Sequence, residues 1–431
     1  MRKLYELTGE RLQGCPPLVK QLPLNEAFSF ATQAFGIGGK LLSLKAVAKW
    51  DELTSGQFES FEDMEKVFGT VFPKPSNLRR WKDDKLFGMQ RLMGVNPDVI
   101  HLCTKIPSKL PVNNEMLKPF LEMSLEDALT KNRIFIIDYE IMDGLPIKSG
   151  FTMTSPIALF YQQNDGTLKP IAIQLFQKPG VDNPVFLPSD PEYTWVLAKM
   201  WFNVADDQLS TNPGKIKAWR LDVDGTLPND IKERGLDGSS CLPDFYYRDD
   251  AMEIYNAILK YVQKYINLYY ASDKEVLNDE ELQQWRKEMV APVDEQGLGM
   301  LVYLEKMTNL LRKNQYEEYA FPPNFDNLTG IPPKTKDKLK EENLNATSST
   351  KSNNVRHTLV ITDTLSTDNT HALGNFEVQY ITDVKALKIL DEFKADLAKI
   401  AQVNKEKNNK DRKIEKYWAL NPKRVPNSIA I

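Results

Sequence analysis

The side chains best suited to bind a metal ion or to act as a nucleophile are scarce in this chain. Its 431 residues include only three histidines and three cysteines: His101, His357, His371, Cys15, Cys103 and Cys241. No two histidines lie one helical turn apart, so none of them form a chelating pair on a single helix. The cysteines show neither the spacing of a metal site nor an even disulfide framework, and are expected to be reduced, buried thiols.

The C-terminus offers a different kind of ligand. The chain ends on the apolar segment Pro426-Asn-Ser-Ile-Ala-Ile431, and Ile431 carries a free α-carboxylate. A carboxylate is a hard, anionic group that can coordinate a metal ion. Most chain ends are frayed and solvated, however. The segment alone therefore does not distinguish a metal ligand from a mobile terminus.

Each histidine also has an ordinary structural interpretation. His101 lies in the apolar run DVIHLCTKIP, which favours a core histidine with a satisfied hydrogen bond. His357 and His371 flank the segment TLVITDTLS and are expected to be surface residues rather than ligands.

The elements that would position these groups can be read from hydrophobic periodicity. Between residues 133 and 177, short β-branched and aromatic runs alternate with turn residues: RIFIIDYEI, PIALFYQQ and KPIAIQLFQ. Such runs predict a small antiparallel sheet, a β subdomain at 133–177. The rest of the chain favours helices, and the fold class is expected to be mainly α.

Two long helices are predicted from apolar residues at i, i+3 and i+4 spacing. The first spans 249–270, with Asp249 or Asp250 as its N-cap. Its stripe is expected to be core: Met252, Tyr255, Ile258, Leu259, Val262, Tyr265, Ile266 and Tyr269. The second spans 382–404, with a similar stripe: Val384, Leu387, Leu390, Phe393, Leu397, Ile400 and Val403.

Composition excludes several classes of protein. The chain is 42% hydrophobic and 26% charged with a net charge of −4, which gives no electrostatic case for binding nucleic acid. It has no apolar stretch long enough to span a membrane and no recognisable signal peptide, so a cytoplasmic location is expected. Residues 331–356 are predicted to be a polar loop. The basic run at 404–413 is expected to be a solvated helix end, with peripheral contact to an acidic membrane surface as the alternative.

Several long segments resemble one known family. They follow the family's order over most of the chain: DDKLFGMQRLMGVNP at 83–97, NRIFIIDYEIMDG at 132–144, TWVLAKMWFNVAD at 194–206, LPDFYYRDDAMEIYNAI at 242–258, LGNFEVQYI at 373–381 and NSIAI at 427–431. Together they look most like the animal-type lipoxygenases. The resemblance implies that residues 1–431 form a lipoxygenase-type catalytic domain, here incomplete and without the family's N-terminal β-barrel.

The resemblance also implies a chemistry, together with its missing parts. Lipoxygenases use a non-haem iron to convert polyunsaturated fatty acids to hydroperoxides. Their iron is held by a His-x4-His pair on one helix, by a later histidine and by the carboxylate of the terminal isoleucine. Of these ligands only Ile431 transfers to this sequence, because the spacing around Asn314 does not match the family's asparagine ligand. No catalytic or substrate-binding residue is assigned.

The histidine ligands are missing at two places where family-like sequence stands on either side. After WFNVADDQ the chain continues with LSTNPGKIKAWRLDVDG instead of the helix with the histidine pair. The segment LVYLEKMTNLLRK, where the third histidine belongs, contains none. Two hypotheses follow: an iron-dependent fatty-acid dioxygenase, as the family predicts, or a non-catalytic relative that binds lipids or proteins. Skipped coding segments, and hence an incomplete gene product, would explain the junctions.

Overall fold

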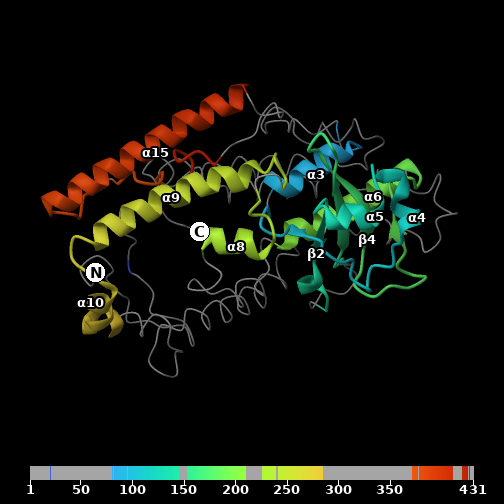
Figure 1. Ribbon diagram of the computed structural model, residues 1–431, viewed down its shortest axis with the longest axis horizontal. Coiled ribbons are helices and arrows are strands. Elements are labelled where there is room, and N and C mark those ends of the chain that lie inside the picture. Colours follow the sequence, from blue (N-terminus) through green and yellow to red (C-terminus); the bar gives the residue numbers. More distant parts are fainter. Residues whose placement is uncertain are drawn as a thin grey trace, which may run out of the picture.

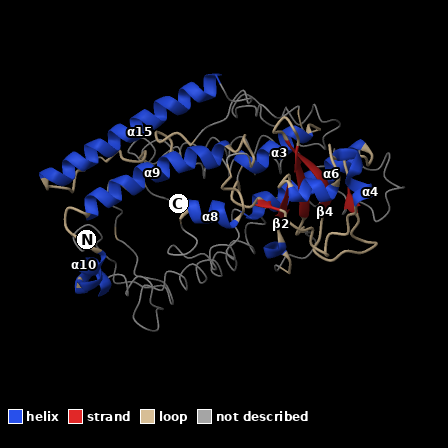
Figure 2. Cartoon of the chain, in the orientation of Figure 1, coloured by secondary structure: helices blue, strands red, loops and turns tan. Residues whose placement is uncertain are grey.

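The computed structural model describes eight stretches of the chain and three single positions. These residues are 20, 80, 82–94, 96–144, 153–209, 226–238, 241–284, 371–376, 378–410, 420–425 and 427. Within them the chain forms one small sheet surrounded by helices and a pair of long helices that extend to one side (Figures 1 and 2). The predicted loop at 331–356, His357, Cys15 and Ile431 lie outside the described residues.

The sheet is an antiparallel meander of five strands in sequence order, β1-β2-β3-β4-β5. Its strands are β1 (His101–Leu102), β2 (Ile134–Asp138), β3 (Ile157–Gln162), β4 (Leu168–Gln174) and β5 (Val185–Phe186). The central pairings align Ile136 with Leu159 and Leu159 with Ala172. The sheet predicted at 133–177 is confirmed, and two short edge strands extend it on either side.

Both faces of the sheet are buried. Phe135, Ile137 and Phe160 face a core shared with α3 (Asp84–Met93) and α6 (Glu192–Leu209). Leu159 and Tyr161 face a second core, covered by three short elements: α4 (Asn114–Leu117), the 3-10 helix η2 (Lys118–Phe120) and α5 (Leu125–Thr130). This double coverage explains why all six residues of β3 are apolar or buried, rather than alternating with polar ones.

Helix α3 approaches the sheet closely at a glycine. A Cβ added to Gly88 would lie 2.0 Å from the carbonyl oxygen of Leu168 in β4. No side chain fits in that space, so glycine lets the helix backbone rest directly on the strand. The contact also fixes the position of Arg91, one turn further along the same helix.

The remaining elements are one short helix after β2 and four helices later in the chain. They are the 3-10 helix η3 (Glu140–Met142), α8 (Leu227–Glu233), α9 (Tyr246–Ile266), α10 (Asp273–Asn278) and α15 (Val384–Lys410). Helices α9 and α15 run side by side (Figure 1). Their ion pairs show an antiparallel register: Glu253–Lys407, Lys260–Asp396 and Lys264–Glu392. Both predicted long helices are therefore present.

The beginning of α9 differs from the prediction. Its N-cap is Phe245, which makes no capping hydrogen bond through its side chain, and Asp249 and Asp250 lie inside the helix. The guanidinium group of Arg248 donates to the carbonyl oxygens of Leu236 and Cys241 at 3.0 and 2.8 Å. These bonds hold the first turn against the preceding loop, so the helix starts earlier than its acidic residues suggest.

The predicted burial of the apolar stripes is confirmed for one long helix but not for the other. On α15, Leu390, Phe393 and Leu397 are buried as predicted, although Val384 at the first position is 79% exposed. On α9 the predicted core stripe is largely exposed, including Ile258, Leu259, Val262, Ile266 and Tyr269. The side of α9 that contacts α15 instead carries Ala257 and Tyr261. The prediction that the α9 stripe is core was therefore wrong for most of its residues.

Within the described ranges, no helix has both the length and the apolar character needed to cross a membrane.

Candidate functional site

A buried polar network lies near the end of α6, just before the first sequence junction. The Arg91 guanidinium group donates to Asp206 Oδ2 at 2.7 Å and to Asn203 Oδ1 at 2.7 Å. Asn96 and the Tyr139 hydroxyl both donate to Asp206 Oδ1. The side chains of Arg91 and Asp206 are only 3% and 9% exposed, so this ion pair is almost fully removed from water.

The surroundings of this network favour a structural role. The Arg91 guanidinium group lies 4.8 Å from the ring centre of Phe87 and 5.2 Å from that of Phe202. Burial, and then the neighbouring Asp206 carboxylate, raise the pKa of Tyr139 well above its usual range. Both carboxylate oxygens of Asp206 already accept hydrogen bonds. The network therefore leaves no acid or base available for catalysis.

The sequence interpretation did not identify this network. The only sequence feature that indicates it is a charged residue within each of two mostly apolar runs: Arg91 in GMQRLMG and Asp206 in WFNVAD. A charge in such a run is buried only if a partner meets it, because an unpaired buried charge is very costly. The partner here is 115 residues away.

His101 lies on the edge strand β1 and is exposed to solvent, so the prediction that it is a core histidine was wrong. Successive side chains in a strand point to opposite faces. Its neighbour Leu102 packs against the first core, which leaves His101 on the other side. The residue is exposed overall, but partial burial of its ring and then the nearby Arg234 guanidinium lower the pKa of His101.

This lowered pKa gives a testable pH dependence. Below about pH 6.5, the ordinary value for histidine, the unfolded chain binds a proton at this position more readily than the folded chain. Stability should therefore fall as the pH drops through that value, and His101→Gln should remove this contribution. Urea midpoints of both proteins, measured from neutral pH to pH 5, would check it. Parallel curves would contradict the lowered pKa.

His371 is buried, at 9% exposure, so its predicted surface position was also wrong. Its carbonyl oxygen accepts from the backbone N–H of Asn427 at 2.7 Å, and the Leu373 N–H donates to the Val425 carbonyl at 2.8 Å. His371 and Leu373 thus pair with Asn427 and Val425, a few residues before the end of the printed sequence. The burial comes from this long-range pairing, which local sequence does not reveal.

The two described histidines are not brought together. His101 belongs to the sheet edge, whereas the segment that follows His371 packs on α15, where a Cβ at Gly374 would lie 2.9 Å from Leu397. Among the described residues, no group of three histidine, cysteine, aspartate or glutamate side chains is placed to hold a metal ion. Iron that activates oxygen needs histidine and carboxylate ligands with open positions. The described donor set does not fit that requirement.

The described thiols are also unsuited to nucleophilic chemistry. Burial raises the pKa of both Cys103 and Cys241 to about 11. The thiolate, which is the reactive form, is therefore scarce at neutral pH. The expectation that these two cysteines are buried, reduced thiols is confirmed.

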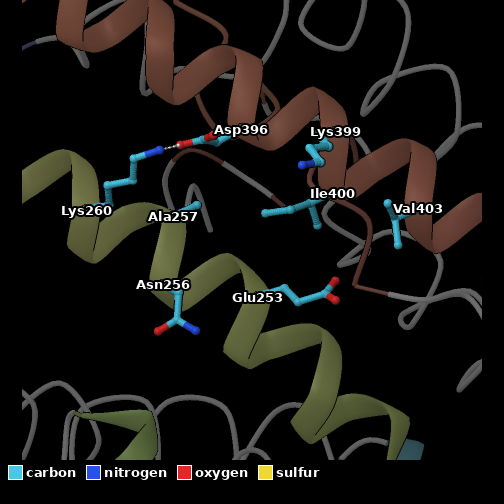
Figure 3. Close-up of a pocket in the computed structure, with 8 residues that line it drawn as sticks. All are labelled: Glu253, Asn256, Ala257, Lys260, Asp396, Lys399, Ile400 and Val403. Carbon is cyan, nitrogen blue, oxygen red and sulfur yellow. Dashed lines mark hydrogen bonds and ion pairs between the residues drawn. The ribbon is translucent and has the colours of Figure 1, made fainter.

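An open groove lies between α9 and α15 (Figure 3). It has a volume of about 390 Å³ and is lined by four residues of each helix: Glu253, Asn256, Ala257, Lys260, Asp396, Lys399, Ile400 and Val403. The sequence interpretation missed it because the lining residues come from helices that are more than a hundred residues apart. The sequence of α9 or of α15, taken by itself, indicates only an amphipathic helix and not the groove between the two.

Comparisons with known sequences agree on one family. The family model described as Lipoxygenase matches residues 43–212 and 213–310. The chain is 27% identical to mouse polyunsaturated fatty acid lipoxygenase ALOX8 over 518 aligned positions, covering 96% of this chain and 75% of the relative. It is also 27% identical to rat arachidonate 12-lipoxygenase, 12R-type, covering 95% and 72%.

Solved structures give the same result for the fold. A calcium-dependent 11R-lipoxygenase aligns with a TM-score of 0.78 and 26% identity, over 100% of this chain and 79% of that protein. A lipoxygenase variant solved in complex with arachidonate aligns with a TM-score of 0.77 and 23% identity, over 100% and 80%. The mainly helical fold with a small antiparallel sheet is thus that of the lipoxygenase structures.

Proposed function

The chain belongs to the lipoxygenase family, and we propose that it is a member that binds polyunsaturated fatty acids without oxygenating them. Fatty-acid dioxygenation with a non-haem iron is the general activity of the family. One neighbouring structure contains arachidonate, which supports this class of ligand. On this view the fold accepts the acyl chain, while its side chains do not hold the metal.

The histidine content of the whole chain carries this proposal. Three histidines occur in 431 residues, and none is one helical turn from another. The two that the structure describes lie in different parts of the fold. Hydrogen abstraction requires an iron held in a fixed ligand field, and a carboxylate alone leaves the metal mostly bound by water. The residues present therefore do not fit the family's iron site.

The alignments support missing internal segments. The match to ALOX8 extends over 518 positions, more than the 431 residues of this chain, so the relative has residues where this chain has none. The family match also divides at residue 212, next to the junction that follows WFNVADDQ. Both observations fit a chain that lacks the helix with the histidine pair, and an incomplete gene product remains one explanation of that loss.

Dioxygenation is the second candidate function. The family match and the ending NSIAI favour it, because Ile431 would supply one carboxylate ligand. That role of Ile431 stays a prediction, as do the cytoplasmic location and the contact of the basic run 404–413 with an acidic membrane.

We expect purified protein to show no enzymatic oxygenation of linoleate or arachidonate. Added Fe(II) should give no conjugated-diene absorbance above that of a heat-denatured control, because no imidazole pair fixes the metal. Elemental analysis should find iron far below one atom per chain. Displacement of a fluorescent fatty acid by linoleate should still report saturable binding.

A relative with the complete ligand set provides the positive control for the same assays. Inserting the family's His-x4-His helix after residue 209, together with the later histidine segment, should restore iron binding. A saturable diene signal from the unmodified chain would overturn the proposal in favour of dioxygenation. Absence of fatty-acid binding would instead overturn the lipid-binding half.

A further inference from the structure

The groove between α9 and α15 has the composition of a site for an anionic amphiphile. We propose that it binds the carboxylate end of a long-chain fatty acid, with Lys399 as the cation that pairs with the carboxylate. The inference rests on the proposed function, because it locates fatty-acid binding at this surface.

The floor of the groove is apolar. Ala257 contributes from α9, and Ile400 and Val403 contribute from α15. Figure 3 shows Ile400 pointing into the space between the two helices. An acyl chain laid over these side chains would remove apolar surface from water, which stabilises binding by roughly 25 cal/mol for each Å² buried.

The charges around the groove are nearly all neutralised by one another. Lys260 pairs with Asp396 at 2.6 Å, and Glu253 pairs with Lys407 at 2.7 Å. Lys399, by contrast, forms no ion pair with any described residue, and Figure 3 shows its side chain at the edge of the groove. Among the described residues, the groove therefore presents one positive charge without a counter-ion beside an apolar floor.

The Lys399 charge and the apolar floor together determine which class of ligand fits the groove. A neutral lipid would leave Lys399 without a partner, and a short anion such as acetate would leave the floor uncovered. A long-chain carboxylate satisfies both features at once. The volume of about 390 Å³ lies within the range of roughly 300–1,000 Å³ that is typical of small-molecule sites.

The test compares two lysines on α15 in the full chain. Lys399→Gln should weaken linoleate binding about fivefold, as expected for loss of a solvent-exposed ion pair. Lys405→Gln removes the same charge from an exposed position outside the groove and should leave the affinity unchanged. Displacement titrations at low ionic strength would measure both, because salt screens exposed charges.

Two further comparisons separate the carboxylate from the acyl chain. Linoleyl alcohol lacks the carboxylate, so Lys399→Gln should not change its affinity. Ile400→Asp should weaken both the acid and the alcohol, because it places a charge on the floor. Circular dichroism and urea midpoints that match the parent protein would show that each variant is folded.

The outcomes distinguish this inference from the proposed function. If linoleate binds but Lys399→Gln and Lys405→Gln behave alike, the fatty acid binds elsewhere and the groove assignment is overturned. If Ile400→Asp leaves the affinity for both ligands unchanged, the floor is not the acyl site. If the parent protein binds no linoleate, the proposed function itself fails.

Discussion

Asp206→Ala should lower the free energy of unfolding by about 3–5 kcal/mol, because it leaves the buried Arg91 guanidinium group without its counter-ion. The pair is almost fully removed from water, and both carboxylate oxygens of Asp206 are engaged. The Tyr139 hydroxyl would lose its acceptor in the same substitution, whereas the Asn96 amide would keep only the backbone carbonyl of residue 206. Buried donors left without partners add to the cost.

Urea denaturation followed by circular dichroism would measure this loss. Glu392→Ala is the matched control, because it breaks an ion pair that is exposed on both sides and should change the midpoint little. The double variant Arg91→Met, Asp206→Leu should recover part of the stability, because apolar residues can replace a buried pair at lower cost. Equal midpoints for Asp206→Ala and Glu392→Ala would show that the network is not buried.

The sheet and the two long helices could be predicted because their signals are local. In β2, Ile134 and Phe135 face opposite cores and both are apolar, so the run itself indicates a strand covered on both faces. In α15, the spacing of Leu390, Phe393 and Leu397 predicts both the helix and its buried side. Periodicity of this kind needs no knowledge of the partner.

The positions of the histidines could not be predicted, because they depend on partners far away in the sequence. His371 is buried by pairing with residues near the terminus, more than fifty positions later. His101 is exposed because it lies on the short edge strand β1, on the face opposite Leu102. Local hydrophobicity gave the wrong expectation for each, since burial is a property of the tertiary fold.

For the candidate site, the sequence predicts mainly a negative property, namely that the family's iron ligands are not all present. The absence of a His-x4-His pair is visible in the printed residues and argues against iron without any coordinates. The groove that accepts the fatty acid in our proposal combines Ala257 of α9 with Lys399 and Ile400 of α15. Its charge balance depends on which lysines meet carboxylates across the two helices, and only the antiparallel register decides that.

The apolar stripe on α9 is a predictable helix face that the described residues leave largely exposed. Five of its side chains are more than a third exposed: Ile258, Leu259, Val262, Ile266 and Tyr269. Periodicity predicts that a face is apolar, but not that anything covers it.

Substitutions on the two sides of this helix pair should therefore differ greatly in cost. Leu397→Ala, in the core between α9 and α15, should lower the free energy of unfolding by about 2–5 kcal/mol. Val262→Ser, on the exposed side of α9, should stay within about 0.5 kcal/mol of the parent, because its side chain is already 41% exposed and the helix propensities are similar. Urea denaturation of both variants would measure the difference. A large loss for Val262→Ser would mean that the stripe is covered in solution, as the sequence alone predicted, and that α9 has a partner on its apolar side.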